Sequence, residues 1–285
     1  MEHSLGLRNS GKKMAETFLI LGSSSFYGRS FMECVRRHGD EASGLHRPFW
    51  ALGTAIPKWN DYIVNFACES LVEESWESPG RWCDTNLTKT GMMFKSLAKR
   101  NDYKRFVHVS TPESYGHTET KVDESHNDWR PSTPYAVSRA SADLMLKAYA
   151  RAFGFRAIIT RTANIYGDGQ TANRIIPLAL KHKREGNPIS LHGGGVTERG
   201  FVHVEDACEA TYLACKEGTD GETYHIATPE VMSIRALVER IGCPIGEDAP
   251  ERVGKDLRYW LDAGRITEMG WKPTIGLDAW LNSTS

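Results

Sequence analysis

Tyr135 and Arg139 stand four residues apart, and a phenol beside a permanent cation can do acid–base chemistry. On a helix this spacing places both side chains on one face. The preceding Thr133 and Pro134 predict where that helix begins, because a hydroxyl caps the first turn and proline fits its first position. A phenol normally has a pKa of about 10, so we expect the guanidinium to lower that pKa by favouring the phenolate.

A second pair of reactive side chains, Thr111 and Glu113, flanks Pro112 about two dozen residues upstream of the tyrosine. The apolar segment 106–109 before them predicts a buried strand. The hydroxyl and the carboxylate should therefore lie at a strand end. A carboxylate there can act as a general base beside the tyrosine.

The first apolar segment, 18–21, runs into a glycine turn from Gly22 to Gly28, and a helical pattern follows through Phe31 and Val35. This order of strand, glycine turn and helix is the context that a dinucleotide-binding fingerprint requires. The glycines let backbone amides approach a pyrophosphate, and the helix N-terminus supplies positive potential. The turn therefore favours a dinucleotide cofactor.

Strands and helices alternate along the chain, which predicts an α/β fold with a Rossmann-like, doubly wound parallel sheet. We expect residues 17–165 to form a dinucleotide-binding domain, to which about 198–216 return. Residues 166–285 should mainly form a smaller α/β substrate-binding lobe. Residues 1–16 are polar and lack the apolar stretch of a signal peptide, so we expect a disordered leader or tag.

The composition is consistent with a soluble enzyme, and we expect a cytoplasmic location. The net charge of −1 gives no long-range attraction to nucleic acid or to an anionic membrane, and no apolar run is long enough to cross a bilayer. The six cysteines form no C-x-x-C pair and do not cluster with histidine. We therefore expect free thiols in a reducing compartment and no metal site.

Three motifs occur in a familiar order: one in residues 106–116, one in 134–139 and one in 161–167. Together they resemble the extended short-chain dehydrogenase/reductase family, and within it most closely the nucleotide-sugar 4,6-dehydratases of the dTDP-glucose and GDP-mannose type. The resemblance runs from about Phe18 to Leu281. Family members usually have lysine at the position of Arg139, and the dTDP-glucose enzymes have aspartate at that of Pro112.

The resemblance implies a role for each reactive side chain. Tyr135, with Arg139 beside it, would remove the proton of the sugar's C4 hydroxyl, Thr111 would bind the C4 oxygen, and Glu113 would remove the C5 proton before water leaves C6. The cofactor would be a nicotinamide dinucleotide, regenerated in each turnover. Its binding residues would be Gly22, Ser25, Phe26, Gly28, Arg47, Ala67, Asn86, Ser110, Tyr135 and Arg139. The nucleotide sugar would contact Asn164, Arg174, Arg199 and Arg258.

The choice between NAD and NADP stays open. The predicted second strand, around Ala42 to His46, ends without the acidic residue that commonly binds the ribose of NAD. Arg47 could meet the 2′-phosphate of NADP or could equally be a solvent-facing loop residue. The segment 47–62 is short for the family, which leaves open whether a sheet strand or its connection is missing.

Two other functions also stay open. The chain could be a 4-epimerase or a UDP-glucuronate decarboxylase, or a catalytically silent nucleotide-sugar-binding protein with the same fold. Glu113 favours elimination, because a simple 4-epimerase needs no such base. The resemblance also implies a homodimer through the helices at about 88–99 and 134–153. The base and the sugar of the substrate do not follow from the sequence.

Overall fold

The computed structural model describes residues 14–46 and 56–284. Arg47 and residues 1–13 of the expected leader lie outside the described residues. Glu16 already belongs to the fold, since its carboxylate pairs with Lys104 at 2.6 Å.

Six strands of the described chain form one sheet in which every neighbouring pair is parallel. The strands are β1 (Thr17–Leu21), β2 (Glu41–Leu45), β3 (Tyr62–Asn65), β4 (Arg105–Ser110), β5 (Ala157–Thr162) and β8 (Thr223–Ile226). Their order, β2-β1-β3-β4-β5-β8, confirms the predicted doubly wound α/β fold. Within the described residues, β2 is the edge strand beyond β1.

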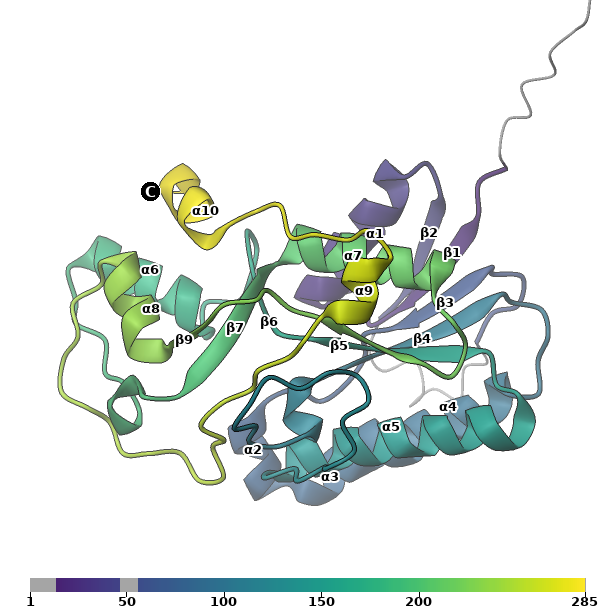
Figure 1. Ribbon diagram of the computed structural model, residues 1–285, viewed down its shortest axis with the longest axis horizontal. Helices are drawn as coiled ribbons and strands as arrows, with labels where there is room; N and C mark the ends of the chain where they lie inside the picture. The colour runs from purple at the N-terminus through teal and green to yellow at the C-terminus, as the bar shows by residue number, and fades with distance from the viewer. Residues whose placement is uncertain (1–13, 47–55, 285) are drawn as a thin grey trace, which may run out of the picture.

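Helices cover both faces of this sheet (Figure 1). One face carries α1 (Phe26–Arg37), α7 (Val204–Glu217) and α9 (Gly264–Glu268). The other carries α2 (Val72–Glu77), α3 (Pro79–Cys83), the π-helical turn η2 (Asp84–Lys89), α4 (Thr90–Leu97) and α5 (Pro134–Phe153). The sheet is therefore the middle of three layers.

Alternate residues of β1 supply two separate cores. Phe18 and Ile20 pack into the core that contains Phe31 of α1, whereas Leu19 and Leu21 pack into the core that contains Phe94 of α4. Side chains of a strand point alternately to its two sides, so a strand covered on both faces must be apolar throughout. This is why the segment reads as a continuous apolar run.

A smaller lobe lies beside the sheet in Figure 1. Its strands are β6 (Asn164–Tyr166), β7 (Glu198–His203) and β9 (Val231–Ser233), and its helices are α6 (Ile175–Glu185), α8 (Ile234–Ile241) and α10 (Leu277–Thr284), with a 3₁₀ turn η4 (Gly193–Gly195). The lobe has its own core around Leu237 and Trp280. After β7 the chain returns to the large sheet as α7, which packs against α1.

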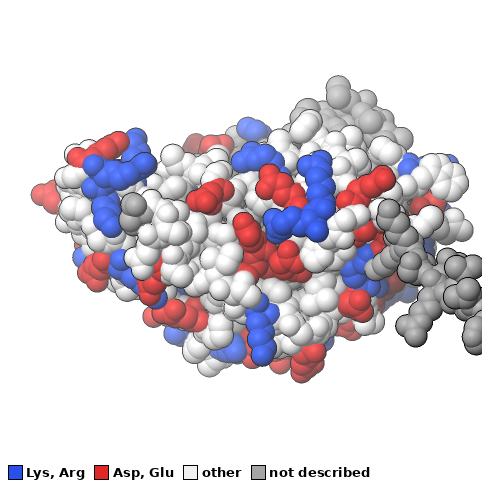
Figure 2. All heavy atoms as spheres, turned by 90° about the horizontal axis from the view of Figure 1, so that it is seen from above, with Lys and Arg blue, Asp and Glu red and all other residues white. Residues whose placement is uncertain are grey.

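Charges of both signs are interspersed over the face seen in Figure 2, without an extended patch of either sign. This fits the net charge of −1. In the described parts of the chain, no helix combines the length and the apolar character that a membrane span needs.

Candidate active site

A cleft of about 1430 Å³ opens at the carboxyl ends of the strands, lined both by loops of the large sheet and by residues of the smaller lobe. Ligands of open α/β sheets bind at this edge. The cleft is lined by the glycine turn after β1, the loops after β3 and β4, the start of α5 and residues of the smaller lobe. It therefore brings the separately predicted motifs together.

The start of α5 places Tyr135 and Arg139 in the cleft. The hydroxyl of Thr133 accepts a hydrogen bond from the Ala136 amide at 3.1 Å, and Pro134 occupies the first helical position. Both parts of the predicted helix start are confirmed. Tyr135 and Arg139 are buried one helical turn apart, and both line the cleft.

Arg139 is anchored by its own donors. Its guanidinium donates to the carbonyl oxygen of Val109 near the end of β4, and the Cys68 side chain lies nearby. Burial alone would lower the pKa of Arg139, but the nearby Cys68, Tyr135 and Asp143 outweigh burial and hold that pKa above its ordinary value. The extra donors of a guanidinium explain how arginine fits a position where relatives have lysine.

Tyr135 does not have the lowered pKa that its spacing to Arg139 predicts. Burial in the cleft raises the pKa of the phenol, and this outweighs the opposing effects of Arg139 and of a hydrogen bond with Thr111. The predicted direction of the shift is therefore wrong, although Arg139 acts in the expected sense. In this structure Tyr135 is a neutral phenol at neutral pH.

Glu113 lies on a 3₁₀ turn, η3 (Pro112–Ser114), directly after β4, and Thr111 is the residue that precedes this turn. The Thr111 hydroxyl caps this turn by accepting from the Glu113 amide at 3.3 Å. Burial raises the pKa of the Glu113 carboxyl to about 7, with Asp256 adding to the rise and Arg199 opposing it. Near neutral pH, Glu113 can therefore either accept or donate a proton.

Asp143 holds the loop that carries these two residues, and the sequence reading missed it. Its carboxylate accepts from the Ser110 hydroxyl at 2.6 Å and from Arg161 at 2.9 Å, while Arg161 also donates to the Thr111 carbonyl at 3.2 Å. Asp143 and Arg161 are fully buried. Asp143 follows Tyr135 by eight residues on one helix, a spacing that could have indicated a shared face.

The glycine turn after β1 has the backbone that a dinucleotide site requires. Gly22 has a φ of +78°, and a Cβ there would lie 2.8 Å from the Ala67 nitrogen. Ser25 takes the position of the middle glycine, where its hydroxyl accepts from the Gly28 amide at 3.1 Å and caps α1. Gly22, Ser25, Phe26 and Ala67 line the cleft, and the α1 N-terminus suits a pyrophosphate there.

Asn86 does not line the cleft but holds together two segments that do. It lies in the π-helical turn η2, where its amide accepts from the Glu69 backbone nitrogen at 2.8 Å and donates to the Ser138 hydroxyl at 3.0 Å. The helix predicted for residues 88–99 is thus preceded by a turn that the sequence did not indicate. Asn86 thereby ties the loop after β3 to α5.

The residues predicted to bind the nucleotide sugar divide into two groups. Asn164, Arg174 and Arg199 line the cleft. Arg199 also stacks on the ring of Tyr259, with its guanidinium carbon 4.1 Å from the ring centre.

Arg258 is not among the residues that line the cleft, so its predicted contact with the nucleotide sugar stays a prediction. Its guanidinium donates to the Thr118 carbonyl at 3.2 Å and to Glu198 at 3.1 Å. The adjacent Tyr259, which the sequence reading passed over, lines the cleft instead.

Comparisons with known proteins agree on one family. The sequence profile of the NAD dependent epimerase/dehydratase family matches residues 54–227. A dTDP-glucose 4,6-dehydratase of Streptomyces niveus is 34% identical over 76% of this chain, and one of Salmonella typhimurium is 30% identical over 79%. These matches span 66% and 71% of the two relatives, so the first relative is covered over slightly less than two thirds of its length.

A solved structure gives a match over nearly the whole chain. DesIV, a dTDP-glucose 4,6-dehydratase from Streptomyces venezuelae crystallised with NAD and TYD bound, superposes with a TM-score of 0.84. It is 29% identical, and the match covers 94% of this chain and 95% of DesIV. The arrangement of sheet and smaller lobe is therefore shared with this enzyme.

Proposed function

The chain belongs to the NAD dependent epimerase/dehydratase family, and we propose that it is a nucleotide-sugar 4,6-dehydratase, which converts an NDP-hexose to its 4-keto-6-deoxy derivative. The observation that carries this proposal is Glu113, a second acid–base group in the cleft beside Thr111 and Tyr135. Exchange of a proton at the C4 oxygen needs one such group. Loss of water across C5 and C6 needs another, because a carbon-bound proton must also be removed.

The cleft fits a nicotinamide dinucleotide. Gly22 and the α1 N-terminus would hold the pyrophosphate, while Tyr135 and Arg139 would lie at the nicotinamide end. When bound, NAD supplies the acceptor and later the donor of the hydride. The DesIV structure with NAD favours this cofactor. β2 ends at Leu45, and the next residue, His46, is not an acid that would exclude NADP. The shifts in melting temperature produced by NAD and by NADP test the choice.

Thr111 and Tyr135 would act at C4 of the sugar. Both side chains line the cleft, so a sugar C4 oxygen placed between their hydroxyls can exchange a proton with Tyr135 while Thr111 holds it. Tyr135 must be deprotonated before it can accept that proton. Arg139 favours the phenolate and so acts on this step.

Glu113 would act at C5 and C6. As a carboxylate it takes the C5 proton, and as a carboxylic acid it gives a proton to the C6 hydroxyl, which leaves as water. Pro112 has no proton to donate, so both tasks fall to Glu113. A pKa of about 7 suits a group that must do both near neutral pH.

Two further expectations from the sequence stay proposals: a cytoplasmic location and a homodimer through α4 and α5. Exposed apolar side chains on these helices favour the dimer, namely Met92 (67% exposed), Val137 (44%) and Leu144 (54%). Val137 and Leu144 are seven residues apart and share a helix face. Leu144→Glu should convert a dimer into a monomer in light scattering, and a wild-type monomer would contradict the proposal.

Incubation with separate nucleotide sugars, beginning with dTDP-glucose, tests the activity. A dehydratase forms a product that has lost water and absorbs in alkali as a 4-keto sugar. An epimerase changes the sugar without a change in mass, and a decarboxylase releases carbon dioxide from UDP-glucuronate. A silent binding protein is stabilised by the nucleotide sugar without turnover. Any of these last three results would contradict the proposal.

A further inference from the structure

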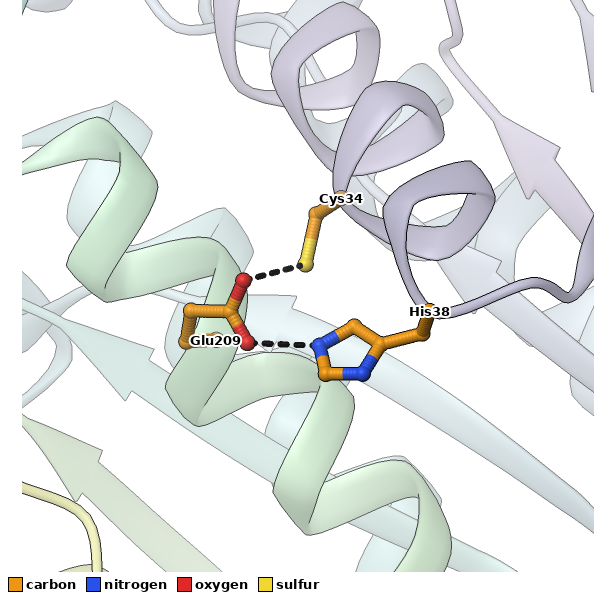
Figure 3. Close-up of side chains that lie close together, drawn as sticks. All are labelled: Cys34, His38 and Glu209. Atoms are coloured by element: carbon orange, nitrogen blue, oxygen red, sulfur yellow. Dashed lines mark hydrogen bonds and ion pairs between the residues drawn. The ribbon is translucent and has the colours of Figure 1, made fainter.

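Three different kinds of metal ligand come together on the side of α1 that packs against α7 (Figure 3). They are the thiol of Cys34 and the imidazole of His38, both at the C-terminal end of α1, and the carboxylate of Glu209 on α7. Their ligand atoms all lie within 4.8 Å of one another. Cys34 Sγ lies 3.4 Å from Glu209 Oε1, and His38 Nε2 lies 2.7 Å from Glu209 Oε2.

Helix packing holds these groups in place. Cys34 and His38 are one turn apart on α1, so they share the face that meets α7. The His38 ring also stacks on Tyr212 of α7, with the ring centres 4.0 Å apart and the planes at 8°. The cluster is therefore built on two packed helices, which is the kind of support that a precise site requires.

We propose that Cys34, His38 and Glu209 bind a zinc ion, with water as the fourth ligand. Thiolate, imidazole and carboxylate are the three side-chain ligands that zinc takes, usually in a tetrahedron. Cys34 is buried, whereas the His38 and Glu209 side chains are both 39% exposed. The ion can enter on that open side, where water completes its coordination. The site is separate from the cleft and does not depend on the proposed enzymatic function.

Binding requires two local changes. The Cys34 thiol must release its proton to solvent as the zinc–sulfur bond forms, because the thiolate is the ligand. Arg37, which donates to Glu209 Oε1 at 3.2 Å, must move away from that oxygen. The Arg37 side chain is 47% exposed and can turn into solvent. The geometry otherwise needs only small movements of His38 and Glu209 to bring all three atoms to about 2.0–2.3 Å from one ion.

The sequence predicted free thiols and no metal site. All six cysteines are indeed free of disulfides. Cys34 and His38 alone, however, have no third ligand nearby in the sequence, since Glu209 follows Cys34 by 175 residues. Only the packing of α7 on α1 completes the set. A bound ion would join these helices and stabilise the domain that carries the glycine turn.

Cobalt serves as the spectroscopic probe. The full-length protein, stripped with a chelator, should bind one Co²⁺ per chain with a thiolate-to-metal charge-transfer band and the intense d–d bands of a four-coordinate ion. Zn²⁺ should displace it and raise the melting temperature. Cys34→Ser should abolish the charge-transfer band, and His38→Gln should weaken binding at least tenfold. Arg37→Gln should tighten binding, because it removes the cation that competes for Glu209.

Cys208→Ser is the matched control, since Cys208 is a buried thiol of α7 outside the three-residue set. It should keep the charge-transfer band. If Cys34→Ser does not fold, His38→Gln and Arg37→Gln still test the site through their opposite effects on affinity. The proposal is overturned if the wild-type protein binds no stoichiometric Co²⁺, if the band survives without Cys34, if His38→Gln leaves the affinity for Co²⁺ unchanged, or if Arg37→Gln weakens binding.

Discussion

Replacement of Glu113 by glutamine separates a catalytic base from a residue that only shapes its loop. The amide keeps the size and much of the hydrogen bonding of the carboxyl but cannot accept the C5 proton. Loss of a positioned acid–base group typically lowers turnover by about 10²–10⁴-fold. We expect a loss in that range for the 4-keto product, together with loss of solvent deuterium incorporation at C5. Binding of the nucleotide sugar, measured by calorimetry, should change little.

The pH dependence follows from the pKa of about 7 for Glu113. If the carboxylate is the base, about a tenth of the molecules are active at pH 6 and about nine tenths at pH 8, so the rate of C5 exchange should rise about tenfold between them. Glu124→Gln is the matched control, because Glu124 is a buried carboxylate that lies outside the cleft. This variant should keep the same pH midpoint.

Stability gives an independent readout of the same group. The pKa of Glu113 is higher in the folded protein than its ordinary value of 4.5, so its stabilising contribution is present below about pH 4.5 and is lost as the pH rises to about 7. At about 1.4 kcal/mol per pKa unit the loss is at most roughly 3.5 kcal/mol, and water in the cleft reduces it. Because glutamine does not ionise, the free energy of unfolding of Glu113→Gln should rise relative to that of the wild type as the pH increases from 5 to 8. If Glu113→Gln dehydrates the nucleotide sugar at the wild-type rate, Glu113 is not the base. If its stability differs from that of the wild type by the same amount at pH 5 and at pH 8, the raised pKa of Glu113 is refuted.

Three further substitutions test the rest of the site. Tyr135→Phe should lower turnover by about 10²–10⁴-fold with little change in sugar binding, and equal activity would remove Tyr135 from the mechanism. Arg139→Met should raise the pH at which turnover is half-maximal, because the phenolate loses its favourable charge, and Arg139→Lys should partly restore it; identical pH profiles would show that this charge does not act on Tyr135. Asp143→Asn should cost about 3–5 kcal/mol in denaturant unfolding because it leaves Arg161 buried without its counter-charge. The exposed Asp128→Asn should stay within about 0.5 kcal/mol, and an equally small change at Asp143 would show that its buried pair with Arg161 does not stabilise the loop.

The parts of the fold that depend on local chemistry could be predicted from the sequence. The apolar run of β1, the glycine turn and the capped start of α5 each have a signal within a few residues, and the structure has all three. The spacing of Tyr135 and Arg139 likewise fixed their common face. These features follow from backbone geometry and helix capping, which neighbouring residues determine.

The features that were missed depend on packing between distant segments. The pKa of Tyr135 is raised because burial in the assembled cleft outweighs the nearby cation, and the extent of burial cannot be read from a spacing of four residues. The bond from Arg258 to the Thr118 carbonyl likewise joins segments 140 residues apart, which the sequence did not indicate. The ligand set around Cys34 likewise depends on the contact between α1 and α7. In each case a tertiary contact decides the role.

The two departures from the family pattern have a common structural explanation. Arg139 spans from α5 to the Val109 carbonyl at the end of β4, so its guanidinium supports the strand end from which the loop of Thr111 and Glu113 begins. Pro112 occupies the first position of η3, where its missing amide proton costs no hydrogen bond. Both residues therefore favour one fixed conformation of this loop. A fixed loop without an acid at position 112 leaves proton donation to Glu113, whose pKa of about 7 permits that second role.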